Sequence, residues 1–259
     1  MKLDILYEDE YLLACIKPGG VPSQGDKSND LDMVSNVTNY LFDNSDSDEE
    51  PYAALIHRLD KPVGGILLFA KDRETAAKLS DMLADGKITK YYQAVLTGEL
   101  PEESGVFTDY IVTDSKTGTS KVVPKDTKGA KRAELSYELL DEFDTDNGPL
   151  SYVLIELITG RHHQIRCQMA AHNAAIWGDM RYNPLFAGKN KNGGKTAGKK
   201  DGHKGPERNG GRGKKAGGKQ DIGLYFSRME FDHPVTGEHI VLKSEPSGTA
   251  FEAIELDEE

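Results

Sequence analysis

The stretch HRLDKPVGGILLFAK (57–71) joins a cluster of charged side chains to an apolar run. Positions 66–69 are all apolar, which is typical of a strand buried on both faces. The run is preceded by four ionisable residues within five positions: His57, Arg58, Asp60 and Lys61. A buried strand gains nothing from such groups, because burying a charge is unfavourable. From its position alone, Asp60 is either a turn-forming residue before Lys-Pro or a carboxylate in a cleft at the sheet edge.

The composition indicates a folded protein with a sizeable core. The chain has 259 residues, of which 37% are hydrophobic, and a formal net charge of -11. No apolar run approaches the roughly 18 residues of a membrane span, and the charged start MKLDILYEDE is unlike a signal peptide. Cys15 and Cys167 lack metal-ligand or disulfide spacing, so we expect reduced core thiols in a cytoplasmic protein without membrane contact.

The segment 188–220 differs from the rest of the chain. It holds 11 Gly and 11 Lys or Arg against only Asp201 and Glu207, which gives a charge of +9. Ala is its only apolar residue type, so the segment cannot bury a core and is expected to be disordered. Two interpretations stay open: a solvated linker, or a flexible basic arm that binds phosphate backbones.

The remaining pattern predicts paired strands mixed with a few helices. A helix over 31–41 is expected behind an Asn29-Asp30 cap, and a second from Asp72 to Leu83 with Gly86 as its stop. A third helix is predicted over 162–173 and a short one at the end of the chain. The expected strands are 5–9, 11–18, 65–71, 88–100, 151–159, 224–231 and 238–244, with further strands over 105–145 separated by turns at 117–118 and 128–129. This order favours the α+β class with a bent, mainly antiparallel mixed sheet, folded as a single domain over 1–259.

Taken singly, the other polar residues have ordinary explanations. Arg166 on its helix is most simply a capping residue or one that extends its charged end to water. His162 and His163 would point about 100° apart on a helix, so hydrogen-bonded or solvated histidines explain them better than a metal site. The glycine pair 64–65 has no phosphate-loop pattern around it, and no G-x-S-x-G sequence occurs.

The order of the motifs is more informative than any one of them. HRLDKPVGGILLFAK is followed by KYYQAVLTGEL (90–100), TGRHHQIRCQMAAHNAAIWGDMRY (159–182) and LYFSRMEFDHPVTGE (224–238). This order resembles the RNA pseudouridine synthase family of the RluA type, over roughly residues 3–245 outside the basic segment. The resemblance implies a bent, mainly antiparallel sheet with an active-site cleft and, because the motifs begin so early, no small S4 RNA-binding domain in front.

The resemblance also implies roles for individual residues. Asp60 corresponds to the catalytic aspartate of HRLD, Tyr92 to the active-site tyrosine of K-x-Y-x-A, and Arg166 to the arginine that pairs with the aspartate. We expect the substrate-binding residues to be His57, Arg58, Lys61, Arg161, His163 and Gln164. The chain departs from the common family pattern at 63–65, at His162 and at Gln168, so contacts to the RNA backbone near these positions are expected to differ.

The chemistry explains why a carboxylate stands among basic groups. Forming pseudouridine breaks the N1–C1′ bond of a uridine, turns the base and rejoins it through C5. An ionised carboxylate must attack C1′ or remove the C2′ proton, and a nearby cation keeps that carboxylate charged. We expect Arg166 to do this through two parallel hydrogen bonds to Asp60. The uridine must leave its stack, and Tyr92 would offer an aromatic face. No redox step occurs, so no cofactor or metal is implied.

The sequence therefore predicts an isomerase acting on structured RNA, ribosomal or transfer RNA, as a monomer. Two other classes were weighed. A non-catalytic RNA-binding or chaperone protein would have no reason to keep Asp60, Tyr92 and Arg166 together. A nucleoside glycosidase would need a second, well-placed carboxylate near Asp60, and the sequence offers none.

Overall fold

The fold is built on one sheet that contains strands from both ends of the chain. The computed structural model describes residues 2–25, 31–46, 49–145, 148–187 and 221–255. The strands are β1 (Asp4–Glu8), β2 (Leu12–Lys17), β3 (Ala54–Leu55), β4 (Gly64–Ala70), β5 (Thr89–Thr97), β6 (Ser104–Asp114), β7 (Thr119–Val123), β8 (Lys131–Thr145), β9 (Gly148–Leu157), β10 (Ala175–Ile176), β11 (Leu224–Asp232) and β12 (His239–Lys243). The helices are α1 (Met33–Asp43), α2 (Arg73–Ala84), α3 (Gln164–Ala171) and α4 (Thr249–Glu255).

The strand order confirms the expected fold class. The sheet runs β1-β2-β4-β11-β5-β9-β8-β6-β7, while β3, β10 and β12 pair at the side with β4, β5 and β11. Among the described strands, only β4 and β11 pair in parallel. The sheet is therefore mixed and mainly antiparallel, with few helices. A single domain over 1–259 stays a prediction.

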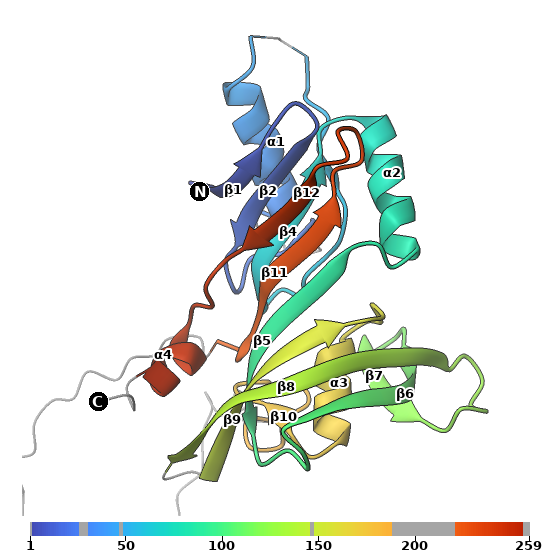
Figure 1. The fold of residues 1–259 in the computed structure, drawn as a ribbon, viewed down its shortest axis with the longest axis vertical. Helices are drawn as coiled ribbons and strands as arrows, with labels where there is room; N and C mark the ends of the chain where they lie inside the picture. The colour runs from blue at the N-terminus through green and yellow to red at the C-terminus, as the bar shows by residue number, and fades with distance from the viewer. Residues whose placement is uncertain (1, 26–30, 47–48, 146–147, 188–220, 256–259) are drawn as a thin grey trace, which may run out of the picture.

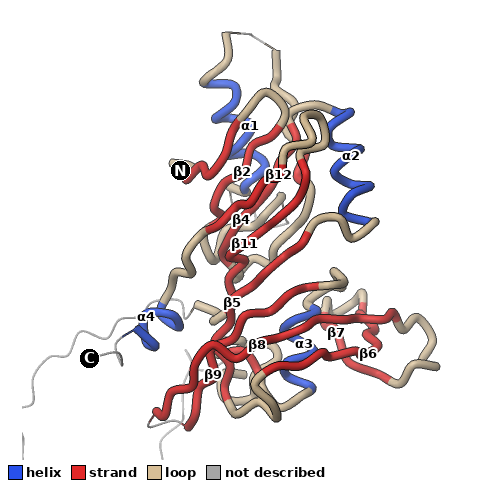
Figure 2. The backbone as a smooth tube through the Cα atoms, viewed as in Figure 1, coloured by secondary structure: helices blue, strands red, loops and turns tan. Residues whose placement is uncertain are grey.

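The sheet forms two lobes joined by a long central strand. In Figure 1, β1, β2, β4, β11 and β12 lie in one lobe with α1 and α2, and β6 to β10 lie in the other with α3. The strand β5 runs between the lobes and pairs with β11 on one side and β9 on the other. Figure 2 shows α2 and α4 at the outside of this continuous run of strands, whereas α3 overlaps the strands of the second lobe. Residues on β5 therefore lie where both lobes can contribute side chains.

Local sequence signals placed α2 correctly. The Asp72 carboxylate accepts hydrogen bonds from the Thr75 backbone N–H at 2.8 Å and from its hydroxyl at 2.6 Å. This satisfies one of the N–H groups left free at a helix start. Gly86, at φ +71°, follows the last turn in the left-handed conformation that glycine adopts readily. The expected cap and stop of this helix are both confirmed.

The expected start of α1 was wrong. Its cap is Asp32, whose carboxylate accepts from the Ser35 backbone N–H at 2.9 Å. Leu31 precedes the helix and is 64% exposed, so it does not begin the apolar face. Positions 29 and 30 fall outside the described residues. Several Asn and Asp residues precede this helix, and all suit a cap, so composition alone selected the wrong one.

The expected start of α3 was wrong too. The helix begins at Gln164, because His163 adopts a left-handed conformation at φ 53°. His162 and His163 therefore both precede the helix, contrary to the expected helix over 162–173. The rings of His162 and His163 instead stack with centroids 3.8 Å apart. This irregular entry decides where the polar side chains of the region point.

The β structure agrees with the expected turns. Strands β6, β7 and β8 turn at Gly118 and Gly129, which have φ +61° and +83°. The turn between β11 and β12 lies at 233–237, between the two strands expected there, and α4 is the expected closing helix. The basic segment 188–220 lies outside the described residues. Of the helices that the structure describes, none is long and apolar enough to cross a membrane.

One glycine and two aromatic rings set the packing of β4, β11 and β5 in the core. Gly65, at φ +126°, lies so close to β11 that a Cβ atom there would overlap the backbone of Phe226. Only glycine permits this approach of the two parallel strands. Phe226 is fully buried and stacks on Tyr92 of β5, with ring centroids 4.6 Å apart and planes 18° apart. The glycine of the motif thus controls the position of an expected active-site residue.

Candidate active site

Residues 57–62 form a loop that leads into β4 and is anchored by residues near the end of β2. Lys17 is fully buried, and its ammonium donates hydrogen bonds to three backbone carbonyls, one of which is that of Lys61. The Ser23 hydroxyl donates to the carbonyl of Leu59 at 2.8 Å and accepts from its N–H at 3.0 Å. The backbone on both sides of Asp60 is therefore fixed before any substrate binds.

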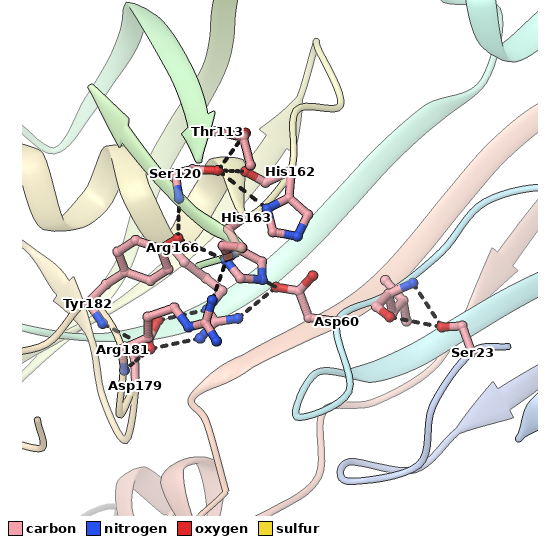
Figure 3. A network of polar contacts seen from close by, with 12 residues as sticks. Ser23, Asp60, Thr113, Ser120, His162, His163, Arg166, Asp179, Arg181 and Tyr182 are labelled. Carbon is pink, nitrogen blue, oxygen red and sulfur yellow. Dashed lines mark hydrogen bonds and ion pairs between the residues drawn. The ribbon is translucent and has the colours of Figure 1, made fainter. Parts of the chain in front are cut away.

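Asp60 meets Arg166 across the interface between the lobes. The Arg166 Nη1 atom donates to Asp60 Oδ2 at 2.8 Å, as Figure 3 shows. The side chain of Arg166 is only 7% exposed, while that of Asp60 is 25% exposed. The pair therefore has its cation buried in the protein and its carboxylate facing the cleft. The expected pairing of these two residues is present, although they stand 106 positions apart in sequence.

The geometry of the pair differs from the expected two parallel hydrogen bonds. Arg166 makes a single hydrogen bond to Asp60 and directs the parallel pair at Asp179, from Nε at 2.8 Å and Nη2 at 2.9 Å. The side chain of Asp179 is fully buried, and its Oδ1 also accepts from the backbone N–H of Arg181 and of Tyr182. The planar guanidinium is held by Asp179 and offers one remaining nitrogen to Asp60.

The electrostatics keep Arg166 charged. Burial alone would lower the pKa of Arg166, but the hydrogen bonds and charge of Asp179, with those of Asp60, outweigh burial and raise it. Burial would likewise raise the pKa of Asp179, and the hydrogen bonds from Arg166 reverse this and lower it. Both groups are therefore ionised at neutral pH, and Arg166 is a permanent cation beside Asp60.

Tyr92 lies on the face of β5 that lines the cleft, and its side chain is almost completely buried. One ring face is covered by Phe226, which also contacts His57 edge-on with centroids 5.3 Å apart. Burial, and then the negative charge of Asp60, raise the pKa of Tyr92 above its usual value. The phenol is therefore protonated throughout the neutral range.

These residues surround one large cleft of about 1470 Å³. Asp60, Tyr92 and Arg166 all line it, so the structure brings together the three residues expected to be catalytic. Five of the six residues expected to bind substrate also line it: His57, Arg58, Lys61, Arg161 and His163. Further cations in the wall are Lys90 and Arg181. An acidic protein thus has a cleft with many basic groups, which suits a polyanionic substrate.

Gln164 is the expected binding residue that does not line the cleft. Its side-chain oxygen accepts from the Thr159 hydroxyl at 2.8 Å and the Arg161 backbone N–H at 2.9 Å. Its amide nitrogen donates to the carbonyl of Glu134 at 3.0 Å, and the residue is only 2% exposed. Gln164 therefore supports the loop that carries Arg161.

His57 and His163 are both neutral residues at the cleft. Burial lowers the pKa of His57 to about 3, and the charge of Lys90 contributes in the same direction. Burial also lowers the pKa of His163 to about 4, although the charge of Asp60 opposes it. Among the described residues no group of three or more His, Cys, Asp or Glu side chains could hold a metal ion.

Sequence reasoning did not assign a role to Lys17, Asp179 or Tyr182. Asp179 and Tyr182 stand inside the quoted stretch 159–182, but nothing in the spacing shows that their partners are Arg166 and His163. For Lys17, a signal existed: a lysine inside an apolar strand pattern, just before Pro and two glycines, must find several acceptors if it is buried.

Comparisons with known proteins identify the family of this chain. A family model described as RNA pseudouridylate synthase matches residues 11–171. A tRNA pseudouridine synthase C from Vibrio parahaemolyticus is 30% identical over an alignment covering 100% of this chain and 98% of the relative. A ribosomal large subunit pseudouridine synthase C from Rickettsia bellii is 33% identical, over 69% of this chain and 56% of the relative.

A solved structure supports the fold. Human RNA Pseudouridylate Synthase Domain Containing 1 has a TM-score of 0.68 at 19% identity, over 95% of this chain and 84% of that one. The family match spans more than half of the sequence, and the Vibrio relative matches over nearly the whole of both chains. The chain belongs to the RNA pseudouridylate synthase family, whose members isomerise uridine to pseudouridine in RNA.

Proposed function

We propose that Asp60 is the carboxylate that acts on the ribose of the target uridine. The observation that carries this proposal is the Asp60–Arg166–Asp179 arrangement, in which a buried arginine is fixed by one carboxylate and donates a hydrogen bond to the other in the cleft. Among the described residues, Arg166 and His163 both approach Asp60 at Oδ2. Its Oδ1 atom is therefore the one we assign to attack at C1′ or proton removal at C2′.

Tyr92 is proposed to contact the flipped base. One ring face is covered by Phe226, so a base meets the other face or the hydroxyl edge. Because the raised pKa keeps the phenol protonated, its hydroxyl contributes as a hydrogen-bonding group and proton relay rather than as a phenolate base. Stacking on an aromatic ring compensates for part of the cost of removing the base from its stack.

Arg58, Lys61 and Arg161 are proposed to bind phosphates on either side of the flipped nucleotide. All three line the cleft, and Arg58 and Arg161 are exposed. His57 lies deeper, against Phe226, and is proposed to bind the substrate as a neutral group. For Gln164 we propose an indirect role, because its amide is occupied in holding the Arg161 loop.

The substrate is RNA, and we propose transfer RNA as the first class to test. The Vibrio relative that matches over the full length of both chains is named for tRNA, whereas the ribosomal relatives match over about 69% of this chain. A cytoplasmic location and a monomeric state are also proposals. The two cysteines, both buried and free, fit a reducing compartment.

The decisive experiment compares Asp60→Asn with the wild-type protein and with Asp81→Asn, a control on the exposed face of α2. Isomerisation releases the C5 hydrogen, so tritium release from RNA labelled at C5 of uridine measures turnover. We expect Asp60→Asn to lose all measurable turnover and to bind RNA within a few-fold of wild type, while Asp81→Asn stays fully active. Turnover retained by Asp60→Asn would refute the proposed role.

Purified tRNA and ribosomal RNA, each lacking pseudouridine, would serve as parallel substrates in the same assay. Release from the tRNA fraction alone supports the proposed class. Release from ribosomal RNA alone would overturn that choice, without affecting the role of Asp60.

A further inference from the structure

Two hydrogen bonds and one longer polar contact lead from strand β7 through Tyr182 and His163 to the carboxylate of Asp60. We propose that His163 is a positioning residue that donates its Nε2–H to Asp60, with its proton held on Nε2 by the Tyr182 hydroxyl. This inference rests on the proposed role of Asp60. It assigns His163 a role different from the substrate contact that the sequence suggests, and it gives Tyr182 a role in the reaction.

The geometry of His163 sets both of its ring nitrogens against specific partners. The left-handed backbone at φ 53° turns the side chain away from α3 and into the wall of the cleft, where it is 10% exposed. Nδ1 lies 2.8 Å from the Tyr182 hydroxyl oxygen, and Nε2 lies 3.5 Å from Asp60 Oδ2. The Nε2–Oδ2 distance is longer than a normal hydrogen bond, and catalytic hydrogen bonds often shorten once substrate is bound.

The partners select one tautomer of the neutral imidazole. The Tyr182 hydroxyl accepts the backbone N–H of Ser120 at 2.9 Å, which leaves its own proton for Nδ1 of His163. The opposite tautomer would aim the lone pair of Nε2 at the Asp60 carboxylate, which is unfavourable. Both ends of the ring therefore favour a proton on Nε2.

Ser120, where this series of contacts begins, is itself held in place. The Ser120 hydroxyl donates to the carbonyl of His162 at 2.5 Å, and it shares a hydrogen bond of 3.0 Å with the Thr113 hydroxyl. The His162 ring then stacks on His163. Ser120 of β7 thus contacts both His162, just before α3, and Tyr182, as the close-up in Figure 3 shows.

Tyr182 contacts both groups that hold Asp60. Its hydroxyl contacts His163, and its ring centroid lies 5.2 Å from the guanidinium carbon of Arg166. Arg166 and His163 both approach Oδ2 of Asp60, so together they restrict rotation of the carboxylate and leave Oδ1 directed to the substrate. A neutral donor does this without adding a second positive charge.

Burial keeps the imidazole of His163 neutral at the pH of the assay. The groups that face it are Asp60, which favours the protonated ring, and Arg166, His162 and Arg181, which together with burial disfavour it. Since burial is the largest influence, the ring is a neutral donor above about pH 5.

The test uses three variants of the full chain in the tritium-release assay at pH 7.5. His163→Leu removes both ring nitrogens, whereas His163→Gln keeps an amide donor near the position of Nε2. Tyr182→Phe keeps the imidazole of His163 but removes the hydroxyl that donates to its Nδ1, so the ring proton is no longer held on Nε2. His239→Gln, at an exposed histidine on β12, is the control, and thermal melting confirms that each variant folds.

We expect His163→Leu to lower kcat by roughly 10- to 100-fold, the range for one hydrogen bond to a charged group, with KM for RNA within about 3-fold. His163→Gln should recover a large part of the loss. In the wild type, ¹⁵N NMR should show Nε2 of His163 as the protonated nitrogen, and Tyr182→Phe should mix the two tautomers. The control should match the wild type in every readout.

Three results would overturn the inference: wild-type kcat in His163→Leu, an effect confined to KM, or a folded His163→Gln as inactive as His163→Leu. An effect on KM alone would restore the substrate-contact role. If Asp60→Asn is inactive and His163→Leu is fully active, only this inference fails. If Asp60→Asn is itself active, the proposed role of Asp60 fails as well.

Discussion

The role of Asp179 gives the sharpest test of how the site is held together. Its carboxylate is fully buried and makes two parallel hydrogen bonds to Arg166, at 2.8 and 2.9 Å. Asp179→Asn keeps the size of the side chain but removes its charge. The NH2 group of the new asparagine side chain would then face a guanidinium nitrogen of Arg166, and both groups can only donate. The substitution therefore leaves the buried Arg166 with Asp60 as its single counter-ion.

The expected loss of stability follows from the burial of the pair. Removing one partner of a buried ion pair costs about 3–5 kcal/mol, and two unit charges about 4 Å apart attract by about 4 kcal/mol at an effective dielectric constant of 20. With a urea slope of about 3 kcal/mol per molar, the unfolding midpoint should fall by about 1.3 M. Typical domains are stable by about 5–15 kcal/mol, so the variant should still fold.

The effect on catalysis should exceed the effect on RNA binding. Without Asp179 the guanidinium loses its fixed orientation, and Nη1 no longer meets Asp60 in one geometry. We expect turnover in the tritium-release assay to fall by roughly 10- to 100-fold, which corresponds to about 1.4–2.8 kcal/mol. RNA affinity should stay within a few-fold. Asp232→Asn, at an aspartate whose side chain is 72% exposed, is the matched control.

A double-mutant cycle separates the pair from its surroundings. Arg166→Met and Asp179→Asn should each destabilise the protein, but the double variant contains no unpaired buried charge at these positions. Its loss of stability should be smaller than the sum of the single losses by about 2–3 kcal/mol. Additive losses, or wild-type turnover and midpoint in Asp179→Asn, would show that Asp179 does not hold Arg166 as described.

Two further outcomes can be measured on the same material. Tyr92→Phe keeps the stack on Phe226 and removes only the hydroxyl, so turnover should fall while RNA binding is preserved. Tyr92→Ala should lose both turnover and RNA affinity. Equal RNA affinity in the two variants would contradict a stacking role. The fold lowers the pKa of His57 to about 3 and that of His163 to about 4. Between about pH 4 and 6.5 the unfolded chain therefore binds more protons than the folded protein. The free energy of unfolding should decrease as pH falls through this window, by up to about 1.4 kcal/mol per pH unit for each histidine. His163→Gln should show a shallower dependence in urea titrations at pH 4.5 to 6.5, and an unchanged slope would show that His163 is not held neutral by the fold.

Several features of the fold followed from the sequence because they depend on near neighbours. The Asp72 cap, the Gly86 stop and the turns at Gly118 and Gly129 are set by residues within a few positions of each other. The alternation of apolar residues in 151–159 is likewise local. The start of α1 was missed because several neighbouring residues can cap a helix, and tertiary packing selects among them.

The motif order identified the family and named Asp60, Tyr92 and Arg166, which do line one cleft. It also suggested a parallel pair of hydrogen bonds between Asp60 and Arg166 that the protein does not form. The preference of guanidinium for a planar carboxylate partner was correct as chemistry. The fully buried carboxylate of Asp179 takes that geometry instead.

The sequence by itself therefore determined the strand and helix pattern, the family and the residue types at the centre of the site. Tertiary structure decided which of those residues meet: Asp60 with Arg166 over 106 positions, Lys17 with the Lys61 carbonyl over 44, and His163 with Tyr182 through a left-handed backbone turn. Helix and strand periods repeat over a few residues and are visible in a single chain. Contacts between distant residues depend on how the lobes pack, and burial then sets the charge of each group.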